Sequence, residues 1–203
     1  MCYSNNIFVQ SFRLLPLQFK LNTVKLKSIV VYCASSIGTN TVYKEVAAEL
    51  ASKLTQKNIR LIYGGGNRGL MGVVADTVME SGGEVVGIIP HFLAELEVAH
   101  STLTELHYVE TMHERKAKMV SMSDAVITLP GGYGTLDELF EILAWKQLGI
   151  FHGVIGVLNV NGFYDNLLAH CDKMVEAGFL RPENRKLILV APTVDELFEK
   201  MGV

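Results

Sequence analysis

Short apolar runs alternate with longer segments of mixed polarity along the chain from residue 28 onward. The apolar runs are rich in Val, Ile and Leu and end at glycine, proline or polar residues, which is typical of buried strands. Because strands that alternate with helices form parallel sheets, we expect one α/β domain with helices on both faces of the sheet. The predicted strands are residues 29–33, 60–63, 84–89, 106–109, 125–129, 154–158 and 187–190, and the predicted helices cover about 40–56, a segment ending near 80, 112–122, a segment after 134, 164–176 and 194–201.

A glycine-rich turn follows the predicted strand at 125–129. Pro130 ends that strand, because proline has no N–H group to donate to the sheet. Gly131, Gly132 and Gly134 let a ligand approach the main chain closely. The free N–H groups and the positive dipole at the start of the next helix favour a bound phosphate at this turn.

Two polar side chains lie near the start of the predicted helix. Thr135 is placed to cap the helix, and Glu138, three residues later, completes the spacing of a capping box. Glu138 also points away from the apolar stripe of the helix, so its carboxylate can reach a ligand at the glycine turn. The sequence leaves two interpretations open, a capping acid that contributes about 1 kcal/mol and a functional carboxylate.

Two further turns, each rich in glycine or serine, also follow predicted strands. They are Ala34–Gly38, which contains Ser35, and Gly64–Gly72, which contains Gly65. The carboxyl ends of parallel strands share one edge of a sheet, so all three turns are expected to line one cleft. Each turn alone also fits a tight strand-to-helix connection, and the second lacks the Gly-Lys-Ser/Thr ending of a P-loop.

The predicted helix at 112–122 carries an arginine within a stripe of methionines. Met112, Arg115, Met119 and Met122 lie along one side, at i, i+3, i+7 and i+10. A guanidinium group in such a stripe snorkels to solvent, pairs with an acid or faces a cleft. The spacing alone leaves these three alternatives open.

Composition excludes several classes of protein. The chain has 203 residues, of which 49% are hydrophobic and 19% charged, as in a single globular domain. The net charge of −3 argues against a general binder of nucleic acid or membrane surfaces, and no apolar run approaches the roughly 20 residues that span a bilayer. The cysteines are widely spaced and the histidines lack the spacing of metal ligands, so we expect a cytoplasmic protein with reduced thiols, no metal and no cofactor.

Residues 1–27 differ in composition from the rest of the chain. They include several basic residues and no acidic one. An acid-poor, basic N-terminus is found in transit peptides, in ordinary extensions and in translation from an upstream start. We favour a non-catalytic extension at 1–27, followed by a catalytic domain at 28–203.

Three motifs together resemble those of one known family. The turn at 130–138 is similar to the PGGxGTxxE signature of the LONELY GUY (LOG) family, whose GGGxxGLMG motif resembles Gly64–Gly72. Met112–Lys116 is similar to the family's Met-His-x-Arg-Lys element. The family consists of cytokinin riboside 5′-monophosphate phosphoribohydrolases, many once labelled lysine decarboxylases. The resemblance covers about 29–197 and implies a Rossmann-like nucleotide-binding domain.

The resemblance also implies which residues form the site. Arg115 coincides with the catalytic arginine of the family, and Glu138 with the glutamate of its signature. Glu97 stands where the family has a substrate-binding glutamate, and Lys116 is expected to approach the phosphate. The expected substrate-binding residues are Ser35, Gly65, Glu97, Met112, Lys116, Gly131, Gly132, Tyr133, Gly134, Thr135 and Asp137.

The implied reaction is hydrolysis of the N-glycosidic bond in adenine-type nucleoside 5′-monophosphates, which releases the free base and ribose 5-phosphate. By analogy with glycosidases, Glu138 would orient or deprotonate the attacking water and face the positive charge that develops at C1′. Arg115 would hold Glu138 ionised and bind substrate oxygens. Two alternatives stay open, a non-catalytic nucleotide or cofactor carrier and a general AMP nucleosidase of salvage.

A homodimer is the last implication of the resemblance. Ile142 and Trp145 fall on the Glu138 side of the central helix, where large apolar groups beside a site need a partner. We expect them to meet a second subunit, with Met112 and Met119 nearby.

Overall fold

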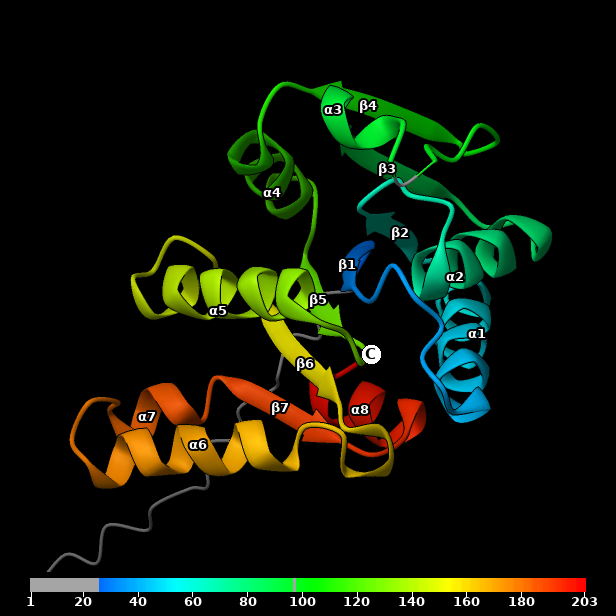
Figure 1. Ribbon diagram of the computed structural model, residues 1–203. Coiled ribbons are helices and arrows are strands. Elements are labelled where there is room, and N and C mark those ends of the chain that lie inside the picture. Colours follow the sequence, from blue (N-terminus) through cyan, green and yellow to red (C-terminus); the bar gives the residue numbers. More distant parts are fainter. Residues whose placement is uncertain (1–25, 97) are drawn as a thin grey trace, which may run out of the picture.

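A computed structural model describes residues 26–96 and 98–203 as one seven-stranded sheet with helices on both sides (Figure 1). The strands follow the order β4-β3-β2-β1-β5-β6-β7, and every neighbouring pair is parallel. The strands are β1 Ser28–Tyr32, β2 Arg60–Tyr63, β3 Val85–Pro90, β4 Glu105–Val109, β5 Ala125–Thr128, β6 Val154–Leu158 and β7 Ile188–Ala191.

The helices alternate with the strands, as the sequence predicts. Two short helices, α3 and α7, and a single 3-10 turn were not predicted, because segments of three or four residues carry no helical period. The helices are α1 Thr41–Gln56, α2 Gly69–Glu80, α3 His91–Ala94, α4 Met112–Ser121, α5 Tyr133–Gln147, α6 Asp165–Glu176, α7 Pro182–Arg185 and α8 Val194–Met201, with the 3-10 turn at Val160–Gly162.

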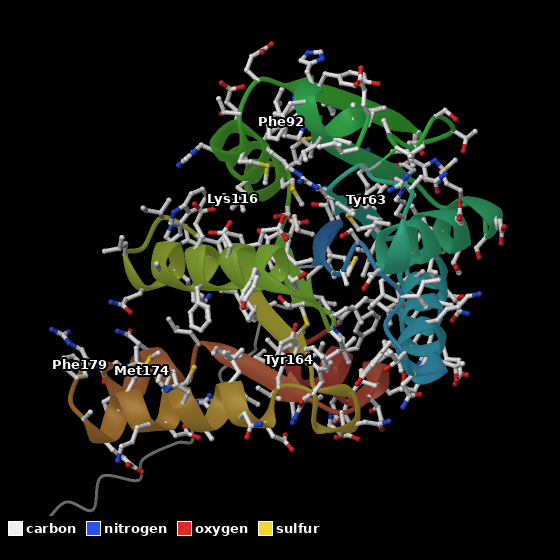
Figure 2. The ribbon with its side chains drawn as sticks, viewed as in Figure 1. Tyr63, Phe92, Lys116, Tyr164, Met174 and Phe179 are labelled. Atoms are coloured by element: carbon white, nitrogen blue, oxygen red, sulfur yellow. The ribbon has the colours of Figure 1, made fainter. Side chains whose placement is uncertain are left out.

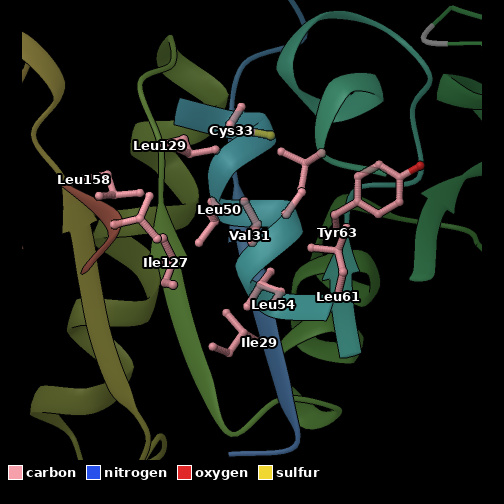
Figure 3. Packing of buried hydrophobic residues seen from close by; sticks show 14 of the residues in the cluster. Ile29, Val31, Cys33, Leu50, Leu54, Leu61, Tyr63, Ile127, Leu129 and Leu158 are labelled. Carbon is pink, nitrogen blue, oxygen red and sulfur yellow. The ribbon is translucent and has the colours of Figure 1, made fainter. Parts of the chain in front are cut away.

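The side chains of β1 show how the sheet builds a core on each face. Ile29 and Val31 pack into the cluster beneath α1, α2 and α8, part of which Figure 3 shows. Val30 and Tyr32 point the other way, into the cluster beneath α4, α5 and α6. Successive side chains of a strand point to opposite faces, so an unbroken apolar run such as 29–32 is buried on both sides.

α5 packs on the sheet through a wider face than the sequence suggested, because the predicted apolar stripe of Leu136, Leu139 and Leu143 packs on the sheet together with further residues. Ile142 is only 1% exposed and lies in the second core cluster with Leu139, and Trp145 packs against the same cluster. The expectation that Ile142 meets a second subunit is therefore wrong. The helical wheel gave the angle between side chains but not how wide a face of the helix the sheet covers.

The strand order reverses next to β1, and this reversal creates a crevice. From β1 the chain builds outward through β2, β3 and β4, and then returns to add β5 on the other side of β1. The connections that leave the carboxyl ends of β1 and β5 therefore run to opposite faces of the sheet. Ligands of open α/β sheets bind at such a point.

Leu54 on α1 provides a test of the core assignment, because its side chain is 0% exposed. Leu54→Ala should lower the free energy of unfolding by about 2–5 kcal/mol through lost burial and a residual cavity. Urea denaturation followed by tryptophan fluorescence measures this change. Leu96→Ala is the control, since Leu96 is 66% exposed and its truncation should change stability by less than about 0.5 kcal/mol. Equal losses in the two variants would contradict the packing described.

Candidate active site

A cavity of about 310 Å³ lies at the crevice between the turns that follow β1 and β5. Most of the predicted site residues border it, including the candidate catalytic pair of Arg115 and Glu138. The residues that line the cavity are Cys33, Ala34, Ser35, Ser36, Met71, Leu93, Met112, Arg115, Gly132, Tyr133, Gly134, Thr135, Asp137 and Glu138.

A larger cavity, of about 870 Å³, lies at the opposite edge of the sheet. Its lining includes Lys27, Arg60 and Glu84, which stand at the amino ends of β1, β2 and β3. None of the predicted site residues borders it. Because parallel α/β sheets bind ligands at the carboxyl ends of their strands, the smaller cavity is the candidate site.

The first turn of α5 faces this cavity without a capping side chain. The helix begins at Tyr133, with Gly132 as its N-cap, and no side chain in the described part of the chain caps it. The prediction that Thr135 caps the helix is therefore wrong, and Glu138 lies in the second turn rather than in a capping box. The N–H groups of the first turn have no partner within the helix, so they are available to an anion.

The glycines of this turn have two different roles. A Cβ atom on Gly131 would lie 2.1 Å from the Oγ1 atom of Thr135, so only glycine permits this packing. A Cβ atom on Gly132 or on Gly134 would meet no described atom within 4 Å. These two positions keep the space above the helix start open for a ligand.

Tyr164, which immediately precedes α6, anchors the start of the glycine turn that follows β5. Its hydroxyl donates a hydrogen bond of 2.7 Å to the carbonyl oxygen of Leu129. Burial raises the pKa of Tyr164 and the nearby Cys33 raises it further, whereas a hydrogen bond with the backbone of Gly131 lowers it. The phenol therefore stays neutral and keeps its proton for Leu129. Tyr164 lies outside all three motifs, and no signal in the sequence pointed to this role.

Arg115 reaches from α4 to the loop that follows β2. Its side chain is 4% exposed, and Nη2 donates to the carbonyl oxygen of Gly64 at 2.8 Å, while Nη1 lies 3.8 Å from the sulfur of Met112. Of the alternatives that the spacing left open, snorkelling to solvent is thus excluded. A Cβ atom on Gly64 would lie 1.8 Å from Nη2, so any other residue there would displace the guanidinium from this position.

The glycine loop from Gly64 to Gly72 supports the site more than it lines it. A Cβ atom on Gly69 would lie 2.2 Å from the backbone of Ser35, which shows how tightly this loop packs on the turn after β1. Gly65 does not border the cavity, and its carbonyl oxygen accepts a hydrogen bond from the backbone N–H of His100. Met71 is the residue by which this loop reaches the cavity.

Three predicted binding residues stand apart from the cavity lining. They are Gly65, Gly131 and Lys116, the last of which is buried in ion pairs with Asp137 and Glu141. Glu97 lies outside the described residues. The buried His100 beside the glycine loop pairs with Asp76, with 2.9 Å between its Nε2 atom and Asp76 Oδ1.

Five residues of the lining were not among the named site residues, although the turns expected to line the cleft contain three of them. Ala34 and Ser36 flank Ser35, so the turn itself was the signal. Leu93 comes from the unpredicted helix α3, where no periodicity marks it. The complete set is Cys33, Ala34, Ser36, Met71 and Leu93.

Neither a metal site nor a membrane span is found in the described ranges, 26–96 and 98–203. Within them no group of three or more His, Cys, Asp or Glu side chains could hold a metal ion. No helix there has the length and apolarity needed to cross a bilayer.

The hydrogen bond of Tyr164 yields a prediction about the glycine turn. Tyr164→Phe should cost about 1–3 kcal/mol of unfolding free energy, because the buried carbonyl oxygen of Leu129 loses its donor. Chemical denaturation of both proteins gives the difference. Tyr108→Phe is the matched control, since Tyr108 is 48% exposed and should change stability by less than about 0.5 kcal/mol. Identical stabilities for Tyr164→Phe and the wild type would refute this anchoring role.

Solved structures share this fold at low sequence identity. The molybdenum cofactor carrier protein of Chlamydomonas reinhardtii superposes with a TM-score of 0.65 at 18% identity, covering 86% of this chain and 94% of that protein. The structure of TM1055 superposes with a TM-score of 0.65 at 23% identity, covering 86% of this chain and 97% of that chain. At these identities the likeness shows the fold alone.

Sequence comparisons are more specific. Residues 71–201 match a family described as possible lysine decarboxylase. The chain is 48% identical to the probable cytokinin riboside 5′-monophosphate phosphoribohydrolase LOG6 of Arabidopsis thaliana, covering 90% of both proteins. It is also 48% identical to the cytokinin riboside 5′-monophosphate phosphoribohydrolase LOG1 of Arabidopsis thaliana. This match covers 87% of this chain and 83% of that protein. The probable cytokinin riboside 5′-monophosphate phosphoribohydrolase LOGL2 of Oryza sativa subsp. japonica is 48% identical to this chain. This match covers 87% of this chain and 72% of LOGL2. The chain therefore belongs to the LONELY GUY (LOG) family of cytokinin riboside 5′-monophosphate phosphoribohydrolases.

Proposed function

We propose that this protein is an N-ribosyl hydrolase that cleaves cytokinin riboside 5′-monophosphates, and AMP as the parent nucleotide, into free base and ribose 5-phosphate. Relatives that are 48% identical to this chain over most of their length are named for this activity. The observation that carries the proposal is that Arg115, Glu138 and the uncapped start of α5 border one cavity.

The start of α5 is suited to the 5′-phosphate. Backbone N–H groups of 132–135 and the helix dipole favour an anion there, and Gly132 and Gly134 leave space above them. Phosphate binding is remote from C1′, so its binding energy can position the ribose for cleavage.

Glu138 is suited to the reacting end of the nucleotide. Cleavage passes through a transition state in which C1′ gains positive charge, which a carboxylate stabilises. Glu138 lies one helical turn beyond Gly134, on the cavity side of α5. It orients or deprotonates the water that attacks C1′, and a positioned base of this kind contributes about 10²–10⁴-fold.

Arg115 supplies positive charge on the facing wall of the cavity. Its guanidinium is anchored to the carbonyl oxygen of Gly64, so it holds one orientation toward the substrate. A fixed cation near Glu138 favours the ionised carboxylate and binds ribose or phosphate oxygens. Met71, Leu93 and Met112 add an apolar wall against which a base can pack.

Two other functions use the same cavity. A carrier would bind the nucleotide without cleaving it, and a salvage nucleosidase would cleave AMP without preference for an N6-prenyl group. The likeness to a molybdenum cofactor carrier is one of fold only, so it does not favour carriage. The presence of both Arg115 and Glu138 in the cavity favours catalysis.

The test is to incubate the purified protein with AMP and with isopentenyl-AMP and to follow the free base by chromatography. Glu138→Gln should reduce base release by at least about 10²-fold while AMP binding persists, because only the general base is lost. Glu199→Gln, an exposed position on α8, is the control and should match the wild type.

Each contrary outcome points to a defined alternative. Binding of AMP by the wild type with no base release would replace hydrolysis by carriage. Equal rates with both nucleotides would favour salvage. Full activity in Glu138→Gln would remove Glu138 from the mechanism.

We also propose that two copies of the chain associate through α5. Phe140, Ala144 and Leu148 are exposed at i, i+4 and i+8, so they form one apolar stripe facing away from the core. Leu148 is 70% exposed, and Ile150, just beyond the helix, is 63% exposed. A continuous apolar surface of this kind marks a protein interface. Tyr133, at the cavity end of the same helix, would place the partner near the mouth of the site.

Sedimentation velocity tests the dimer. The wild type should sediment with twice the chain mass at micromolar concentration, and Leu148→Glu should sediment as a monomer because it buries a charge in the interface. Ile37→Glu, another exposed apolar position that lies outside α5, is the control and should leave the dimer intact. A monomeric wild type would end this proposal.

We place the activity in residues 28–203 and the protein in the cytoplasm. Cys171 is a buried free thiol, which fits a reducing compartment. Residues 1–25 lie outside the described part of the chain.

A further inference from the structure

One buried ammonium group joins α4 to α5 beside the candidate site. Lys116 is 7% exposed, and its Nζ atom lies 3.0 Å from Asp137 Oδ2 and 3.1 Å from Glu141 Oε1. Figure 2 shows Lys116 between these two helices. Lys116 directly follows Arg115 on α4, and Asp137 directly precedes Glu138 on α5. The two ion pairs thus cross-link the segments that carry the candidate catalytic pair.

The charge on Lys116 is retained despite its burial. Burial lowers the pKa of Lys116, but hydrogen bonds and charge interactions with Asp137 and Glu141 raise it, and the pKa ends above its ordinary value. The amine is therefore protonated at neutral pH. It forms ion pairs with carboxylates of α5, and it does not border the cavity.

α5 concentrates negative charge at this point. Asp137, Glu138 and Glu141 fall within little more than one helical turn, and Glu141 is a surface neighbour of both others at i+4 and i+3. Carboxylates this close disfavour each other's ionisation. Lys116 compensates the charges of Asp137 and Glu141, and Glu138 borders the cavity.

The other groups around Glu138 come from β1 and α4. Tyr32, at the end of β1, is buried, and its pKa lies well above the usual value because of burial and then the charges of Glu138 and Glu141. The phenol is therefore neutral and adds no charge. Cys33 lines the cavity, and Arg115 extends toward Gly64.

We propose that Lys116 is a positioning residue for the reaction and not a ligand of the substrate phosphate. Its ion pairs with Asp137 and Glu141 fix α5 against α4. They also neutralise two carboxylates that would otherwise favour the protonated form of Glu138. This inference rests on the proposed hydrolase function, and it replaces the expectation from sequence that Lys116 approaches the phosphate.

Loss of Lys116 has two consequences under this proposal. The spacing between Arg115 and Glu138 is no longer fixed, and a displacement of about 1 Å costs on the order of 10²-fold in rate. Asp137 and Glu141 also become uncompensated, so Glu138 takes up its proton at higher pH. Neither consequence concerns affinity for the phosphate.

The test compares Lys116→Met, which keeps the length of the side chain and removes its charge, with Lys116→Arg, which keeps the charge. Lys116→Met should lower kcat by about 10²-fold with KM for AMP changed by less than about twofold, and the acid limb of the pH–rate profile should move to higher pH. Lys116→Arg should retain most of the activity. Lys116→Met/Glu141→Gln should recover part of the loss, because it removes a carboxylate together with the cation.

A phosphate ligand would behave differently in the same assays. Lys116→Met would then raise KM and weaken inhibition by ribose 5-phosphate, with the pH profile unmoved and no recovery in the double variant. That result would overturn the proposal.

If Lys116→Met does not fold, Glu141→Gln serves as the test. The proposal expects a lower kcat in this variant and an acid limb moved to lower pH, because one negative charge near Glu138 is gone. An unmoved limb would count against it.

A measurement without turnover separates this inference from the function itself. Failure of the wild type to release base would refute the hydrolase. NMR titration of ¹³C-glutamate carboxyls, with Glu138 assigned from Glu138→Gln, follows proton uptake in either case. The Glu138 titration should move to higher pH in Lys116→Met, and an unchanged titration would refute the role given to Lys116.

Discussion

The reversal of strand order at β1 is the constraint on which the rest of the site depends. β1 is flanked by β2 and β5, so the connections that leave the carboxyl ends of β1 and β5 run to opposite faces of the sheet. The crevice between them receives Ser35 and Ser36 from one side and 132–138 from the other. An uncapped helix start opens into this crevice, and the N–H groups of such a start have no partner within the helix.

Glycine serves this site chiefly by allowing chain segments to approach one another. Gly64 lets the guanidinium of Arg115 reach the carbonyl oxygen of Gly64 itself. Gly69 lets the glycine loop from Gly64 to Gly72 lie on the turn after β1. Gly131 makes room for Thr135. Among the site glycines that the structure describes, Gly132 and Gly134 are the two at which a Cβ atom would meet open space. The same residue type therefore supports the scaffold at some positions and leaves room for the ligand at others.

Charge is arranged across the contact between α4 and α5. α4 buries Arg115 and Lys116 at successive positions, and α5 presents Asp137 and Glu141 to Lys116. Burying two cations is costly unless each is paired or hydrogen-bonded, and here carbonyl and carboxylate oxygens meet that need. A helix pair held in this way resists small displacements, which a reaction that depends on orientation requires.

The sequence by itself determined the class of fold, the three motifs and the candidate pair of Arg115 and Glu138. Apolar runs and helical spacing are local properties, so the parallel α/β pattern could be read directly from them. Tertiary structure decided the strand order, the buried face of α5 that takes Ile142 into the core, and the partners of Lys116. These depend on which distant segments meet, because a helical wheel fixes angles within one helix and says nothing of what packs against it.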